Sequence, residues 1–154
     1  MRCLTAIKIQ RPMADIILYT DGGARGNPGP AALGVYIETL DKRYGEYIGR
    51  ATNNEAEYQA IVFALKKVRQ LVGKAKSKNT TLELRSDSEL IVKQLNGLYK
   101  LKEARFYEFF IEIWNRKQDF SDVQFTHIER SKNVVADATL NEALDRQKRP
   151  KQLL

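Results

Sequence analysis

Hydrophobic and polar positions follow two periods along this chain, one typical of strands and one typical of helices. Short apolar runs bounded by Gly, Pro, Asn or Asp predict strands at 16–21, 31–37, 43–48, 81–86 and 123–128. Apolar residues recur with helical spacing at 54–72, 88–95, 101–118 and 133–146. Short connections separate the first three strands, which are therefore expected to form a meander. The order of elements predicts an α/β fold, a mixed five-stranded sheet flanked by helices.

A single domain is expected to account for most of the 154 residues. Residues 1–14 show no clear period and are expected to be an N-terminal extension of the domain at 15–146. Residues 147–154 are expected to form a basic C-terminal tail. Segment 73–79 is rich in Lys and contains Gly and Ser, which predicts a loop between a helix and a strand.

Composition and charge narrow the classes of partner. Lys and Arg number 26 against 19 Asp and Glu, and the net charge of +7 fits either a nucleic-acid partner or an ordinary solvated surface. No apolar run approaches the ~18 residues needed to span a bilayer, so no membrane partner is expected. Cys3 is the only cysteine, which excludes an internal disulfide and a cysteine-based zinc site. Because no secretory signal is evident, we expect a cytoplasmic location, and nothing demands more than a monomer.

Two acidic residues are expected at the ends of strands. Asp21 ends the strand predicted at 16–21, and a turn rich in Gly, Asn and Pro comes after it. Backbone amides in such a turn are open to a ligand, which suggests a metal site facing phosphates. A simple turn acid is the alternative explanation. Asp87 follows the strand at 81–86, where an Asp commonly caps the next helix instead.

Two further acidic residues are expected on the inward faces of helices. Glu57 precedes an apolar stripe made by Ala60, Ile61, Ala64, Leu65 and Val68. Asp137 lies on a stripe with Val134, Leu140 and Leu144. A buried carboxylate is costly unless it is paired, protonated or bound to a metal. For Glu57, a favourable position in the first helical turn is the alternative explanation.

Each acid has a simple explanation by itself, but together they are expected to converge on one end of the sheet around a cation. Ligands that offer only oxygen, without Cys or paired His, favour Mg²⁺ or Mn²⁺ over zinc. Four carboxylates shared between two ions about 3.5–4 Å apart is the arrangement of two-metal phosphodiester chemistry.

At this point the chain resembles the type 1 ribonuclease H family over residues from about 16 to about 145. Four motifs in this order make the resemblance specific, although any one of them alone would be weak. The residues that carry it are Thr20-Asp21-Gly22 with Gly26-Asn27-Pro28-Gly29-Pro30, then Thr52-Asn53-Asn54-Glu55-Ala56-Glu57-Tyr58, Ser86-Asp87-Ser88, and His127 and Asn133 leading to Ala136-Asp137.

The resemblance implies an endoribonuclease that hydrolyses the RNA strand of RNA–DNA hybrids and leaves 5′-phosphate and 3′-hydroxyl ends. It implies a ribonuclease H-like sheet, and two Mg²⁺ ions, with Mn²⁺ as a possible substitute. The metal ligands and catalytic residues implied by the family motifs are Asp21, Glu57, Asp87 and Asp137.

Two residues are candidates for an auxiliary catalytic role. His127 lies ten residues before Asp137, the spacing of the family's mobile histidine, although a structural hydrogen bond also explains a histidine at a strand end. Arg130 lies seven residues before Asp137 and is the alternative, since it could reach the phosphate. The loop at 128–132 lacks glycine, unlike loops built to move.

The resemblance also implies residues that bind the substrate. Asn27, Asn53 and Asn54 match positions that contact RNA around the scissile bond, and hydrogen bonds to 2′-hydroxyls distinguish RNA from DNA. Turn formation by Asn27, and helix capping by Asn53 or Asn54, are equally plausible roles. Thr52 resembles a residue that grips a phosphate of the DNA strand. Gly22 and Ser88 complete the expected substrate-binding set.

The chain departs from some bacterial members by lacking a long basic insertion before the last strand, so a short form is expected. The basic stretch at 99–102 and the tail are expected to grip the hybrid instead. Helical spacing of the aromatic residues Phe106, Tyr107, Phe109, Phe110 and Trp114 favours a core face over base stacking.

Two other functions stay open from the sequence. The short form leaves room for a nuclease of this fold that also cleaves double-stranded RNA. A non-catalytic module that binds hybrids is the other, but four clustered acids without a metal would repel one another and lower stability.

Overall fold

The computed structural model describes residues 12–148, so most of the expected N-terminal extension and C-terminal tail lies outside the described residues. The strands are β1 (Ile16–Ala24), β2 (Gly29–Ile37), β3 (Lys42–Ala51), β4 (Thr81–Ser86) and β5 (Asp122–His127). The helices are α1 (Asn53–Val72), α2 (Lys74–Ser77), α3 (Glu89–Leu95), α4 (Tyr107–Lys117) and α5 (Val134–Lys148). Short 3₁₀ turns are η1 (Glu38–Leu40), η2 (Ala104–Phe106) and η3 (Arg130–Lys132).

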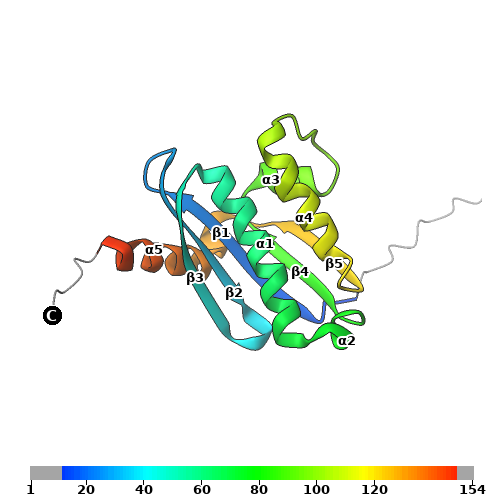
Figure 1. Cartoon of the computed structure of the whole chain (residues 1–154). Helices are drawn as coiled ribbons and strands as arrows, with labels where there is room; N and C mark the ends of the chain where they lie inside the picture. Colours follow the sequence, from blue (N-terminus) through cyan, green and yellow to red (C-terminus); the bar gives the residue numbers. More distant parts are fainter. Residues whose placement is uncertain (1–11, 149–154) are drawn as a thin grey trace, which may run out of the picture.

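The five strands form one mixed sheet in the order β3-β2-β1-β4-β5 (Figure 1). β1, β2 and β3 pair antiparallel, as the predicted meander requires. β4 and β5 are added parallel to β1. The predicted α/β fold with a mixed five-stranded sheet is therefore confirmed, and β1 lies at the centre of it.

Helices cover both faces of the sheet, and glycines let two of them approach closely. A Cβ added at Gly22 would lie 2.2 Å from the carbonyl carbon of Ala56 in α1. A Cβ added at Gly34 would lie 2.1 Å from the carbonyl oxygen of Ala136 in α5. Successive strand residues point to opposite faces, and a Cβ at Gly23 would face Leu140 of α5 at 3.5 Å. α1 and α5 thus pack on opposite faces of β1 and β2.

The main core lies between the sheet and α1. Its largest fully buried side chains include Tyr58, Leu18, Ile61 and Leu84. A smaller apolar cluster under α5 joins Ala32 of β2 to the inward residues of that helix, Leu140, Ala143 and Leu144. Within the described residues, no helix is both long enough and apolar enough to cross a membrane.

Several boundaries differ from the sequence predictions. β1 continues through Gly22 to Ala24, because these residues keep their pairing with β2, so Asp21 lies inside the strand and not at its end. Segment 73–79 contains the short helix α2 and is not only a loop. The helix expected at 101–118 begins at Tyr107, because the 3₁₀ turn before it places Phe106 in the core first.

The core face expected for the aromatic residues of α4 is only partly correct. Phe106 is buried, and Phe109 packs against the core beside Tyr58. Tyr107 and Trp114, however, are 47% and 57% exposed, because α4 lies at the edge of the core. Val134 was expected on the inward face of α5, but it is 61% exposed at the first turn of that helix.

Candidate active site

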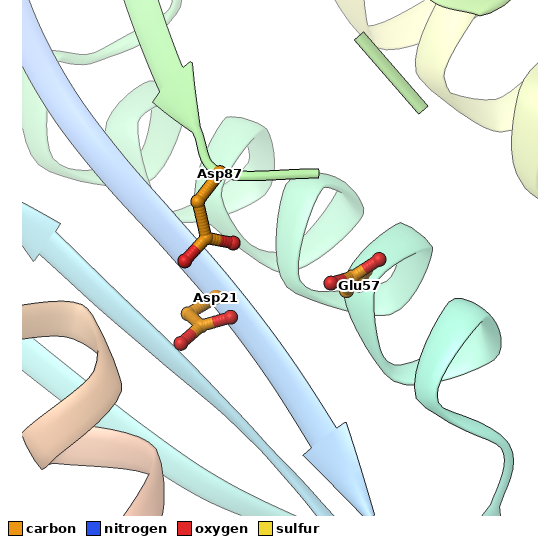
Figure 2. A group of neighbouring side chains, drawn as sticks. All are labelled: Asp21, Glu57 and Asp87. Carbon is orange, nitrogen blue, oxygen red and sulfur yellow. The ribbon is translucent and has the colours of Figure 1, made fainter. Parts of the chain in front are cut away.

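Three of the four predicted acids meet beside β1. One carboxylate oxygen from each of Asp21, Glu57 and Asp87 lies within 4.8 Å of the others (Figure 2). Asp21 and Asp87 come together because β1 and β4 are parallel and pair Thr20 with Ser86, so each acid follows a paired residue. Glu57 reaches them from the first turns of α1, which the contact at Gly22 seats against β1.

The fourth acid, Asp137, lies outside this group of three but lines the same cavity of about 450 Å³. The contact between Ala136 and Gly34 seats the start of α5 on the sheet. Asn133 strengthens this placement, since its NH₂ group donates to the Thr20 carbonyl at 2.9 Å. The cavity is also lined by Arg25, Asn53, Arg130 and Asn141.

Crowding of these carboxylates changes their acidity. Burial, followed by the charges of Asp87, Glu57 and Asp137, raises the pKa of Asp21 to about 8. Burial also raises the pKa of Glu57 to about 7, against the lowering effect of a hydrogen bond from Ser88. A cation bound among the carboxylates would favour their ionised forms. A donor set made of carboxylate oxygens fits a hard divalent ion.

Helix capping does not explain Asp87. The N-cap of α3 is Ser88, whose hydroxyl accepts from the amide of Ile91 at 3.5 Å. Ser88 also hydrogen-bonds to Glu57. The Asp87 carboxylate is therefore left to the cavity, and Ser88 supports the cluster while capping the helix.

The two auxiliary candidates lie in different surroundings. Arg130, in the 3₁₀ turn before α5, lines the acid-lined cavity, and its charge lowers the pKa of Glu57. His127 is an exposed residue at the end of β5 and is absent from the lining of that cavity. On geometry Arg130 is the better placed of the two.

Four of the six predicted substrate-binding residues gather around the start of α1. Asn27, Thr52, Asn53 and Asn54 line a hollow of about 400 Å³, together with Pro28 and Arg105. Gly22 has a packing role, because the absence of a Cβ at this position lets the backbone of Ala56 approach β1 closely.

The alternative prediction that Asn53 or Asn54 caps α1 is wrong. Thr52 is the N-cap, and its hydroxyl accepts from the Glu55 amide at 3.2 Å. Asn53 instead accepts from the amide of Ala24 at 2.8 Å, and Asn27 accepts from the amide of Asn53 at 3.0 Å. These contacts tie the turn after β1 to the start of α1.

Arg25, Arg105 and Asn141 also line these hollows, and sequence reasoning did not find them. The only signal for Asn141 is its spacing, four residues after Asp137 on a predicted helix. Arg25 lies outside the segments with a predicted period, and Arg105 lies in the helix expected at 101–118 but carries no signal of its own. Only the folded chain places them beside the acids and the asparagines.

β1 lies at the centre of the sheet, with antiparallel neighbours on one side and parallel neighbours on the other. This sheet, with a carboxylate cluster beside β1, defines a ribonuclease H-like domain. The profile of the reverse transcriptase-like family matches residues 19–143. The chain belongs to this family.

Relatives with curated names and solved structures agree with this class. The chain is 40% identical over 131 residues to ribonuclease HI of Halobacterium salinarum, an alignment that covers 82% of this chain and 63% of that protein. A protein of Mycobacterium tuberculosis described as bifunctional is 31% identical over 84% of this chain and 35% of its own length. The chain thus spans 63% and 35% of the length of these two relatives, less than two thirds in each case.

Two solved structures match this chain over nearly their whole length. The crystal structure of LC11-RNase H1 in complex with an RNA/DNA hybrid superposes with a TM-score of 0.80 at 45% identity, covering 86% of this chain and 98% of that one. RNase H1 of Halobacterium salinarum gives 0.77 at 38% identity, covering 85% and 98%. The predicted resemblance to type 1 ribonucleases H is confirmed.

Proposed function

We propose that this chain is an endoribonuclease that hydrolyses the RNA strand of RNA–DNA hybrids and leaves 5′-phosphate and 3′-hydroxyl ends. The observation that carries the proposal is the meeting of Asp21, Glu57 and Asp87 in a cavity that Asp137 also lines. The similar ribonuclease HI and the similar structure with a bound hybrid support the choice of substrate.

Four acids, Asp21, Glu57, Asp87 and Asp137, are proposed as ligands for two Mg²⁺ ions, with Mn²⁺ as a substitute. When bound, such ions activate a water molecule as the nucleophile and stabilise charge on the leaving oxygen. Burial, followed by the charges of neighbouring carboxylates, raises the pKa values of Asp21 and Glu57, and a cation bound among these groups would offset the cost of ionising them.

The remaining residues bind and orient the substrate. Asn27, Asn53 and Asn54 are proposed to contact the RNA strand, where donors and acceptors that meet 2′-hydroxyls select RNA. Gly22 and Ser88 are proposed to contact the backbone near the acids, and Thr52 a phosphate of the DNA strand. Arg130 is proposed to hold the scissile phosphate, with His127 as the less favoured auxiliary residue.

The short form needs another basic surface to hold the duplex. The connection between α3 and α4 carries Lys100, Lys102 and Arg105, all exposed. Lys100 and Lys102 line a cavity of about 600 Å³ together with Asn54 and Tyr58, and Arg105 lines the neighbouring hollow with Asn54. We propose that this connection contacts the DNA strand in place of the missing insertion. The expected monomeric state and cytoplasmic location stay predictions.

Incubation with labelled substrates tests the proposed function. An RNA–DNA hybrid, a matched RNA duplex and a DNA duplex are each incubated with Mg²⁺, with Mn²⁺ and with a chelator. We expect cleavage of the RNA strand of the hybrid in either metal, none in chelator, and intact hybrid binding but no cleavage by Asp21→Asn. Cleavage that persists in chelator contradicts the metal mechanism. Cleavage of the RNA duplex would widen the substrate class, and binding without cleavage would favour the non-catalytic module.

A further inference from the structure

A series of polar contacts links the turn after β1 to the fourth acid. Nη2 of Arg25 donates to the side-chain oxygen of Asn141 at 3.4 Å and to Asp145 at 2.8 Å. The NH₂ group of Asn141 donates to the carbonyl oxygen of Asp137 at 3.0 Å and to its carboxylate at 3.4 Å. Arg25 and Asp137 therefore contact opposite ends of one side-chain amide.

Chemistry of the partners fixes the orientation of that amide. A guanidinium group only donates and an ionised carboxylate only accepts, so the amide oxygen must face Arg25 and the NH₂ group must face Asp137. Asn141 lies one turn after Asp137, at the spacing where side chains meet on one face of a helix. All three side chains line the acid-lined cavity.

Arg25 also begins the turn that carries Asn27. Its backbone amide donates to the carbonyl of Pro30 at 2.8 Å and so closes the turn. The contacts of Asn27 and Asn53 fasten this turn to the start of α1, while the side chain of Arg25 fastens it to α5. Residues expected to touch RNA are thereby connected to one of the expected metal ligands.

We propose that Asn141 is a positioning residue which, together with Arg25, holds the Asp137 carboxylate in place and links it to the turn that carries Asn27. The inference rests on the proposed function, in which Asp137 is a metal ligand. Side chains that orient a ligand contribute to metal affinity without touching the ion. Asp21, Glu57 and Asp87 already lie together, whereas Asp137 stands outside their group and its carboxylate accepts from Asn141.

Calorimetric titration of Mn²⁺ into the full chain, with no nucleic acid present, tests this role directly. We expect Asn141→Ala and the similarly sized Asn141→Leu to weaken Mn²⁺ binding about 10-fold, because both lose the donor to Asp137. Glu142→Ala changes an exposed residue on the same helix and should bind Mn²⁺ as the wild type does. Circular dichroism melts check that each variant is folded.

Kinetics on the hybrid separate positioning from substrate binding. Asn141→Ala should lower kcat about 10-fold and leave KM nearly unchanged, because the loss affects a ligand of the reacting group and not the grip on the duplex. Arg25→Gln should lower kcat less in the Asn141→Ala background than in the wild type, because the contact of Arg25 with Asn141 is already lost there while its contact with Asp145 is not.

The outcomes distinguish this inference from the proposed function. Equal Mn²⁺ affinity of Asn141→Ala and Glu142→Ala refutes the positioning role, whatever the hybrid assay gives. If the wild type binds Mn²⁺ but leaves the hybrid intact, the proposed function is wrong, and the Mn²⁺ comparison still decides the role of Asn141.

Discussion

Gly22 of β1 and Ala56 of α1 meet backbone to backbone, since a Cβ on Gly22 would lie 2.2 Å from the Ala56 carbonyl carbon. Asp21 precedes Gly22 and Glu57 follows Ala56, so this single contact sets how close two of the clustered carboxylates come. The helix can approach the strand this far only because the strand has no side chain at that point.

Gly22→Ala is therefore expected to move the start of α1 away from β1. The added methyl group should cost about 1–3 kcal/mol of stability through overpacking. A shift of Glu57 by about 1 Å should also lower kcat on the hybrid roughly 100-fold. Urea unfolding and hybrid cleavage measure the two effects.

Gly23→Ala is the matched control for this change. Its Cβ would meet only the Cδ1 of Leu140 at 3.5 Å, an ordinary contact distance. Equal stability losses in the two variants would show that the glycine contact with α1 has no special role.

Stability of the metal-free protein should fall as pH rises. Asp21 has a pKa of about 8 in the folded chain and an ordinary value of 3.8, so between about pH 4 and 8 the folded state binds a proton that the unfolded state has lost. This contribution is fully present below pH 4 and lost as pH passes 8. Asp21→Asn should remove it and be more stable than wild type at pH 8 by on the order of 5 kcal/mol.

Urea unfolding in chelator at pH 5, 6.5 and 8 measures this difference. The gap between Asp21→Asn and wild type should widen with pH, and Mg²⁺ should narrow it at pH 8 by stabilising the wild type. A gap that is constant across the three pH values would contradict the raised pKa that burial and the neighbouring carboxylates give Asp21.

Binding to the hybrid should weaken steeply with salt if the connection between α3 and α4 contacts phosphates. Removing Lys100 and Lys102 together by substitution with Ala should lower the slope of log K against log salt by up to about 2, one for each lost phosphate contact. The pair Lys74→Ala and Lys76→Ala in α2, beyond the opposite end of α1, is the charge-matched control. If the slope falls equally in both pairs, the basic charge acts as a general property of the surface and not through contacts made by the connection between α3 and α4.

Arg130→Ala should lower kcat more than His127→Ala does, since only Arg130 lines the acid-lined cavity. Loss of one charge that faces the developing phosphate charge typically costs about 100-fold in kcat. Single-turnover cleavage of the hybrid at saturating enzyme separates this loss from weaker binding. A larger loss in His127→Ala would contradict the preference for Arg130 and make His127 the auxiliary residue.

Apolar periods in the sequence predict those parts of the site whose position depends on a single strand or helix. Apolar periods predict a strand at 16–21 and a helix at 54–72, the cores of the observed β1 and α1, and these periods alone place Asp21 and Glu57 near buried faces. The strand Thr81–Ser86 was predicted at its observed bounds, so Asp87 follows it as expected.

Contacts between distant segments could not be predicted in the same way. Gly22 looked like part of a turn because glycine is common in turns, yet it continues the strand and admits Ala56. Tyr107 and Trp114 have the spacing of a core face, but a period says which residues share a face and not whether anything covers it. Arg25 and Asn141 are 116 residues apart, and no local pattern joins them.

The order of the elements along the chain places two of the four acids in its first half and two in its second half. Asp21 and Glu57 precede the segment around α2, and Asp87 and Asp137 follow it. A chain cut at Asn79 would carry half of the acids on each piece, and neither piece alone could assemble the cavity. Reassociation of the two pieces would have to rebuild the pairing of β1 with β4, so cleavage of the hybrid would report directly on whether the halves have met.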